Sequence, residues 1–207
     1  MKVILVNGSP HHMGSTYTAL EQAAEILREE GIEVEHFWIG AKPLSGCLGC
    51  GKCLSNGGRC FMDDSVNEFL DKAASADGFI FGSPVHYAAI SGALSSFMDR
   101  AFYGKGNLFR FKPAAGIVVC RRAGATAAFD ELNKYFTISS MPVVSSKYWN
   151  MVHGTSPEEI RQDKEGMQIV RELARNMAWM LKCIQAGRLA GINPPQSEPP
   201  VKTNFIR

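Results

Sequence analysis

The chain has 207 residues, and its 22 Lys and Arg against 20 Asp and Glu give a formal net charge of +2. This length suits one well-cored α/β domain, and the scattered basic residues argue against nucleic acid as a partner. No apolar run approaches the roughly 20 residues of a membrane span, and residues 3–6 are too short for a signal-peptide core, so we expect a soluble, cytoplasmic protein.

Strand-like and helix-like segments alternate along the chain. Short apolar runs predict strands at residues 2–7, 33–38, 78–82, 114–120 and about 142–146. Helical periodicity predicts helices at residues 15–30, 64–75, 92–103, 124–137 and 158–186. This alternation predicts an α/β fold, in which a five-stranded parallel sheet carries helices on both faces. The spacing fits the flavodoxin-like strand order 2-1-3-4-5.

We expect one domain over residues 1–186. The remaining residues, 187–207, are rich in proline and predict a tail that is not helical. In doubly wound sheets, ligands bind beyond the carboxyl ends of the strands, near the point where the strand order reverses. This rule selects the loops that follow residues 7, 82 and 120 as ligand-binding loops.

The first of these loops, residues 8–16, joins a buried strand to the start of an amphipathic helix. Helix N-termini present free N–H groups and a positive dipole end, so the turn is suited to an anion. The Lys of a P-loop and the Gly-x-Gly-x-x-Gly dinucleotide motif are both absent, which favours a terminal monophosphate. The alternative is that Ser15 only caps the helix. The candidate binding residues are Ser9, His11, Gly14, Ser15 and Thr16.

The second loop follows the third predicted strand. Pro84 stiffens its backbone, which allows neighbouring amides and carbonyls to face a flat polar ring, and His86 or Tyr87 can flank that ring. The alternative is an ordinary strand-to-helix turn whose aromatic side chain packs on the sheet edge. The candidate binding residues are Ser83, Pro84, Val85, His86 and Tyr87.

The third loop follows the fourth predicted strand and contains Arg121, Arg122 and Gly124. Two arginines at the end of a buried strand can place positive charge near an anionic ring such as a reduced flavin. The alternative is that the arginines face solvent or pair with Asp130 or Glu131.

Together these motifs resemble the NADPH-dependent FMN reductase family of flavodoxin-fold proteins, and within it the iron–sulfur flavoproteins. The matching motifs are Gly-Ser-Pro and Gly-Ser-Thr in the first loop, Gly-Ser-Pro-Val at residues 82–85, Asp99-Arg100, and Arg-Arg-x-Gly at residues 121–124. The resemblance runs from residue 1 to about 186. It implies that FMN binds with its phosphate on the first loop, its ring against Ser83 to Tyr87, and the third loop near the ring.

One position departs from the family pattern. His11 stands where the family usually has Arg or Lys. An unperturbed histidine is neutral above about pH 6.5, so the phosphate site is less cationic there. This difference bears on the affinity for FMN and not on the identity of the site.

Four cysteines, Cys47, Cys50, Cys53 and Cys60, form the pattern C-x2-C-x2-C-x6-C within the segment 40–63. Compact spacing favours a [4Fe–4S] cluster over a zinc ribbon, which has two widely separated C-x2-C pairs. Free thiols, a redox-active pair and zinc remain the alternatives. The resemblance to the iron–sulfur flavoproteins implies a cluster beside the flavin. Cys120 and Cys183 are expected to be small core residues.

No catalytic acid or base is predicted, because a flavin carries the redox chemistry and the protein orients it. The main expectation is NAD(P)H-dependent reduction of a flavin, a quinone or another small acceptor. The alternative is an electron carrier that takes electrons from a ferredoxin through the cluster, and a non-enzymatic flavin- or metal-stabilised binding protein is a third possibility. The long segment 40–63 would leave a cluster wet unless a second subunit covers it, so we expect a homodimer or homotetramer.

Overall fold

The computed structural model describes residues 1–199, 201 and 203. Its five parallel strands form one sheet in the order β2-β1-β3-β4-β5, which confirms the predicted flavodoxin-like order. The strands are β1 (Lys2–Asn7), β2 (Glu33–Trp38), β3 (Gly78–Pro84), β4 (Ala114–Cys120) and β5 (Met151–His153).

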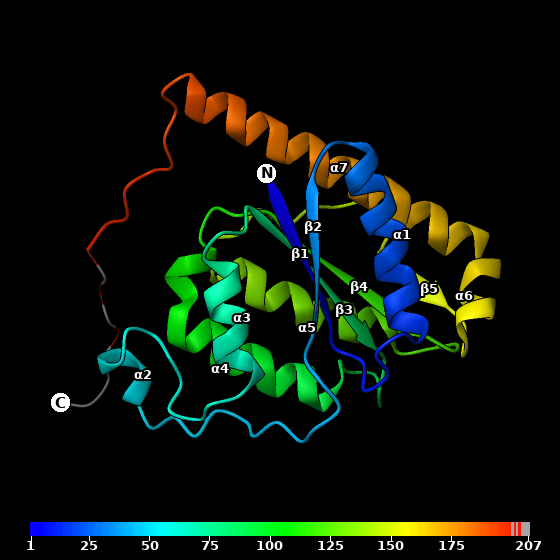
Figure 1. The fold of residues 1–207 in the computed structure, drawn as a ribbon, viewed down its shortest axis with the longest axis horizontal. Helices are drawn as coiled ribbons and strands as arrows, with labels where there is room; N and C mark the ends of the chain where they lie inside the picture. Colours follow the sequence, from blue (N-terminus) through cyan, green and yellow to red (C-terminus); the bar gives the residue numbers. More distant parts are fainter. Residues whose placement is uncertain (200, 202, 204–207) are drawn as a thin grey trace.

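Helices cover both faces of the sheet (Figure 1). One face carries α1 (Ser15–Glu29), α6 (Pro157–Gln162) and α7 (Lys164–Leu189). The other face carries α3 (Ser65–Ala73), α4 (Gly92–Phe109) and α5 (Ala125–Ile138). A single turn, α2 (Lys52–Ser55), lies within the cysteine segment.

Alternation along the strands explains the two layers. In β1, Val3 and Leu5 are buried against the face that carries α1 and α7, whereas Ile4 and Val6 are buried against the face that carries α3 and α4. Successive side chains of a strand point to opposite faces, and a parallel sheet covered on both faces is therefore apolar throughout. The sheet is thus rigid and dry beneath the loops at its carboxyl edge.

The fifth strand does not lie at the predicted residues 142–146. In that segment Val143 makes only an isolated bridge with Ala114, and the edge strand forms later, where Met151–His153 pairs with the end of β4. Between the two pieces, the buried Asn150 side chain donates to the Gly116 carbonyl at 3.0 Å. This side-chain bond replaces a bond of the backbone ladder, so the chain runs along the same edge with an interruption.

The predicted helix 158–186 is two helices, because Asp163 ends α6 and begins α7. One Asp163 carboxylate oxygen accepts from the Gly166 N–H at 2.9 Å, and the other accepts from the His153 N–H at 2.7 Å. The helix also continues to Leu189, past the expected start of the tail, because the first proline there is Pro194.

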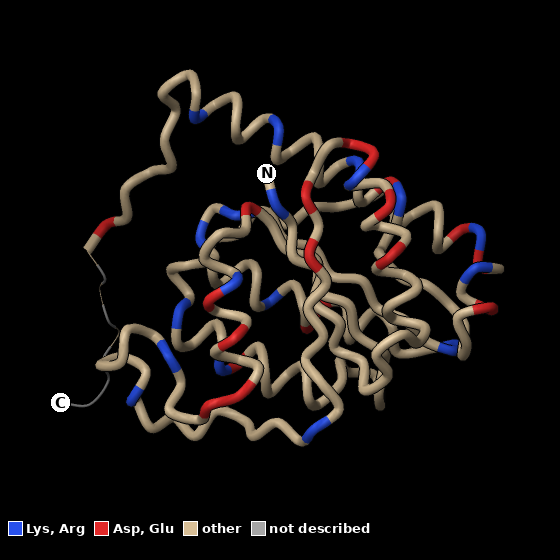
Figure 2. The backbone as a smooth tube through the Cα atoms, viewed as in Figure 1, with Lys and Arg blue, Asp and Glu red and all other residues tan. Residues whose placement is uncertain are grey.

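The two cysteines that were expected in the core, Cys120 and Cys183, differ in their burial. Cys120 is buried as expected, but Cys183 is exposed, because the last turns of α7 extend beyond the sheet (Figure 1). In the view of Figure 2, positions of Lys and Arg and positions of Asp and Glu are both scattered over the described backbone. Within the described residues, none of the helices combines the length and apolarity needed to cross a bilayer.

Candidate functional site

The first loop is held from the inside by Asn7, the last residue of β1, which is 2% exposed. Its side-chain amide donates to the His12 carbonyl at 2.9 Å, and its side-chain oxygen accepts from the Ser9 N–H at 3.0 Å. The Trp38 indole donates to the Ser9 carbonyl at 2.8 Å, and its ring stacks on His12. These contacts fix the backbone of the loop and leave its outer side, including His11, exposed.

The start of α1 lies directly behind this loop. Ser15 is the first helical residue, Gly14 is the N-cap, and no side chain of the described residues caps the helix. The alternative in which Ser15 only caps the helix is therefore not what the fold uses. Uncapped first-turn N–H groups are the donors that an anion needs. Thr16 is buried with its methyl group toward Gly82, and a Cβ at Gly14 would lie 2.9 Å from the Cβ of His11.

Ser91, just before α4, joins the first loop to the second. Its hydroxyl donates to the Gly8 carbonyl at 2.6 Å and accepts from the Leu94 N–H at 3.2 Å as the N-cap of α4. Its own N–H donates to the Ser83 hydroxyl at 3.0 Å, and the Gly8 N–H donates to the Gly82 carbonyl at 2.9 Å. The two loops therefore form one buried hydrogen-bonded unit.

The second loop ends in a tight turn. His86 and Ala89 exchange backbone hydrogen bonds at 3.0 Å, and the two residues between them, Tyr87 and Ala88, have φ values of 51° and 60°. Left-handed backbone at two residues without glycine costs of order 1 kcal/mol each, and such strain is concentrated at ligand-binding turns. The Tyr87 ring is fully exposed at the tip, so it does not pack on the sheet edge.

The third loop approaches this turn closely. Gly124 has a φ of 85°, and a Cβ there would lie 2.8 Å from the Cα of Ala88. Arg121 and Arg122 are exposed, and among the described residues neither has a carboxylate within ion-pair distance. The alternative pairing with Glu131 is not seen, because that carboxylate accepts from the Ile90 N–H at 2.9 Å. Both side chains therefore face solvent at the rim, as that alternative also expects, and hydrogen bonds from Thr155, helped by the charge of Arg121, lower the pKa of Glu159.

All the predicted flavin-site residues thus lie at one edge of the sheet. The first two loops are joined by Ser91, and the second and third touch at Gly124. The first loop supplies N–H groups and hydroxyls, the second supplies backbone and aromatic groups, and the third supplies positive charge. This arrangement can bind a molecule with a monophosphate at one end and a flat polar ring at the other.

The four cysteines of the segment 40–63 line one small pocket beside α4, together with apolar side chains and Arg100. Cys47 and Cys50 are exposed, and Cys53 and Cys60 are half-buried. Within the described part of the chain, no three Cys, His, Asp or Glu side chains converge on a position for a single metal ion. Four thiols around one pocket form a donor set that suits tetrahedral zinc as well as a [4Fe–4S] cluster.

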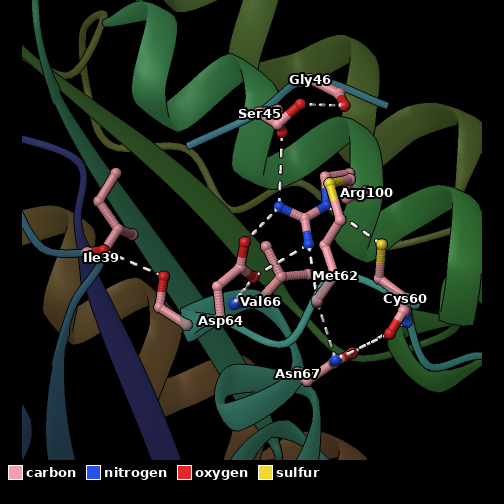
Figure 3. Close-up of polar contacts among 10 residues, drawn as sticks. Ile39, Ser45, Gly46, Cys60, Met62, Asp64, Val66, Asn67 and Arg100 are labelled. Atoms are coloured by element: carbon pink, nitrogen blue, oxygen red, sulfur yellow. Dashed lines mark hydrogen bonds and ion pairs between the residues drawn. The ribbon is translucent and has the colours of Figure 1, made fainter. Parts of the chain in front are cut away.

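Cys60 is held by two buried polar residues, Asn67 and Arg100 (Figure 3). The Asn67 side chain accepts from the Cys60 N–H and donates to the Cys60 carbonyl, both at 2.9 Å. The Arg100 Nε lies 3.4 Å from the Cys60 Sγ. Both residues lie on the helices α3 and α4, so the thiol at the end of an irregular segment is fixed to the rigid domain.

Sequence reasoning missed the residues that support the site. Asn7, Ser91 and Asn67 have no role in the sequence-based predictions. A signal existed for Ser91, because Ser before an apolar periodic run is a typical helix N-cap. No signal existed for the contact of Trp38 with Ser9, because these residues are 29 positions apart.

A family model for NADPH-dependent FMN reductases matches residues 1–156. An iron–sulfur flavoprotein of Methanocaldococcus jannaschii is 33% identical over 193 residues, covering 89% of this chain and 100% of that protein. An iron–sulfur flavoprotein of Methanosarcina thermophila is 26% identical, covering 91% of this chain and 99% of that protein. Among solved structures, an archaeal flavodoxin has a TM-score of 0.60 at 14% identity, covering 88% of this chain and 99% of that chain, which supports the flavodoxin-like fold. The chain therefore belongs to the NADPH-dependent FMN reductase family, in its iron–sulfur flavoprotein branch.

Proposed function

We propose that this protein is an FMN-dependent oxidoreductase that takes electrons from NAD(P)H and reduces a flavin, a quinone or another small acceptor. The observation that carries the proposal is the joining of the three loops at one edge of the sheet by Ser91 and Gly124. FMN, when bound, supplies the redox chemistry. The protein supplies the binding and orientation.

Each loop has a distinct task in this proposal. In the first, the N–H groups at the start of α1 and the hydroxyls of Ser9, Ser15 and Thr16 bind the phosphate, and His11 adds charge when protonated. In the second, residues Ser83 to Tyr87 lie against the flat ring. In the third, Arg121 and Arg122 stabilise negative charge on the ring.

The cysteine pocket fits a [4Fe–4S] cluster by the chemistry of its donors. Its lining includes four thiols, the number of thiolate ligands that a [4Fe–4S] cluster takes. Cys47, Cys50, Cys53 and Cys60 would hold the cluster.

Anaerobic mixing with NADPH or NADH tests the main proposal. We expect the flavin absorbance to bleach within the turnover time of the enzyme and to return when a quinone or free flavin is added. Bleaching by reduced ferredoxin alone would contradict the reductase. Iron and acid-labile sulfide, assayed in the same preparation, should each be about four per chain if the cluster is present.

The second candidate function is an electron carrier that takes electrons from a ferredoxin. Exposed apolar side chains around the thiols, Leu48, Leu54 and Phe61, favour it, because such a patch suits a transient protein contact. Replacing Leu54 with Asp should slow reduction by ferredoxin and leave reduction by NADPH unchanged. Equal effects on both donors would argue against ferredoxin docking there.

We also propose a homodimer or homotetramer. The exposed apolar side chains of Trp179 and Ile192 line one hollow with Phe111 and Pro142, and Leu189 is exposed at the end of α7. Apolar groups this large rarely stay in water together in a single subunit. Light scattering after gel filtration should give two or four times the mass of one chain, and a monomer would refute this proposal.

A further inference from the structure

We infer that Arg100 is a positioning residue for the cluster: it donates an N–H to the Cys60 thiolate, holds this ligand in place and raises the reduction potential. This inference rests on the cluster of the proposed function. It assigns a role to a side chain that the flavin site does not use. Figure 3 shows Arg100 between Cys60 and Asp64, with its guanidinium directed at both.

Each N–H group of the guanidinium donates a hydrogen bond. Nε faces the Cys60 Sγ at 3.4 Å, and the terminal nitrogens donate to the two oxygens of Asp64 at 2.7 and 3.0 Å. The remaining contacts go to the backbone carbonyls of Met62, at 3.1 Å, and Ser45, at 3.4 Å. This fork is the geometry that Arg offers and Lys does not.

The guanidinium is almost completely removed from water, since its side chain is 1% exposed. Burial lowers the pKa of Arg100, but hydrogen bonds to Asp64 and Cys60 raise it by more, so the group stays charged. A buried charge is tolerated only when it is paired and hydrogen-bonded. Asp64 alone satisfies the pairing, and the contact with sulfur is additional to it.

A cation and an N–H donor at one ligand act on the cluster in a defined direction. Reduction of a bound cluster would add one electron while the guanidinium keeps its proton, so the total charge of the site would fall by one. Positive charge and hydrogen bonds to the sulfurs favour the more negative state and therefore raise the reduction potential. Loss of Arg100 should lower it.

Other cations near the pocket do not share this position. Arg59 precedes Cys60, but it is half-exposed and pairs with Asp71. Lys52 lies over the Phe61 ring, 4.4 Å from its centre. Among the described residues, Arg100 is the cation with a hydrogen bond to a cysteine sulfur. Arg59 therefore serves as a control for positive charge in the same segment.

The experiment uses the full chain, purified anaerobically, in three pairs of proteins. Asp64→Asn keeps an N-cap residue on α3, and its amide oxygen can still accept a hydrogen bond from the buried Arg100 guanidinium. Comparison with Arg100→Met/Asp64→Asn then isolates the loss of Arg100 without leaving the half-buried Asp64 carboxylate unpaired. Arg100→Lys, compared with the natural protein, keeps the charge and loses the fork. Arg59→Met, compared with the natural protein, is the control.

The readouts are iron per chain and the potential of the cluster in a mediated spectroelectrochemical titration. The reduction potential of the cluster should be lower in Arg100→Met/Asp64→Asn than in Asp64→Asn by about 59 mV, which is about tenfold in the equilibrium constant for transfer of one electron. Arg100→Lys should lower the potential by a smaller but measurable amount, and Arg59→Met should change the equilibrium by less than about threefold because its charge is screened by solvent.

Equal potentials in Asp64→Asn and Arg100→Met/Asp64→Asn, at equal iron content, would overturn the inference and leave Arg100 a purely structural residue. If circular dichroism shows that the double variant is unfolded, Arg100→Lys decides, because it keeps the ion pair with Asp64. An unchanged potential in that variant then overturns the inference. Natural protein without iron would overturn the proposed cluster first, and the inference with it.

Discussion

Ser91 offers a sharp test of how the flavin site is assembled, because one buried hydroxyl joins two ligand loops and caps α4. Ser91→Ala removes both bonds and adds no bulk. Loss of an N-cap hydrogen bond costs about 1 kcal/mol. Leaving the buried Gly8 carbonyl without its partner costs about another 1–2 kcal/mol.

The expected loss is therefore about 2–3 kcal/mol in the free energy of unfolding. For a domain of this size, about 1 kcal/mol corresponds to about 2–4 °C in Tm, so we expect a decrease of about 5–10 °C. Because Gly8 begins the phosphate loop, FMN affinity should also fall by about tenfold, the equivalent of one hydrogen bond.

Urea denaturation of the apoprotein, followed by far-ultraviolet circular dichroism, measures the first effect. Quenching of FMN fluorescence measures the second. Ser96→Ala in the same helix is the control, since the Ser96 hydroxyl makes no hydrogen bond within the described residues. A Ser91→Ala protein as stable as the control, with the same affinity for FMN, would refute the account of a joined two-loop unit.

Three further predictions concern other parts of the chain. Gly124→Ala should weaken FMN binding measured by fluorescence, because it adds left-handed strain of about 1 kcal/mol and a clash with the neighbouring turn, whereas Gly106→Ala, in open space within a helix, should not. Hydrogen bonds from Lys2 and Lys72 lower the pKa of Glu35 below its ordinary value of 4.5. The stabilisation that ionised Glu35 gives the folded state is therefore complete above pH 4.5, and it is lost as the pH falls through the lowered pKa of the folded protein. Glu35→Gln should therefore cost about 1 kcal/mol at pH 7 and nothing in strong acid, and the more exposed Glu33→Gln should cost less in the same urea titrations. Asn67→Ala should cost about 2–3 kcal/mol and speed iron release, measured with a chelator, because it frees the backbone around the fourth cysteine; an unchanged release rate would contradict that role.

Sequence periodicity was sufficient for four of the five strands and for the loops at their carboxyl ends. Buried parallel strands are apolar throughout, so β1, β3 and β4 are visible as short apolar runs. The edge strand carries a weaker signal, since only Val152 of its three residues is buried. Its position depends on the Asn150 side chain, which bonds to a strand 34 residues away and has no local pattern.

The candidate site divides in the same way. Cysteine spacing and the glycine- and serine-rich turns are local patterns that can be read directly from the sequence. Arg100 and Asp64 are 36 residues apart, and nothing in either segment predicts the other as its partner. Buried polar pairs of this kind depend on the packing of α3 against α4, which the sequence pattern alone does not specify.

Titration of the purified protein with FMN tests the central claim most directly. The protein should be yellow as purified, or after removal of its cofactor it should quench FMN fluorescence with saturation at one FMN per chain. The His11→Arg variant, which places a permanent cation on the phosphate loop, should bind FMN more tightly. A colourless protein that leaves the fluorescence of FMN unchanged up to about millimolar concentration would contradict the account, because a specific cofactor site binds far more tightly than that.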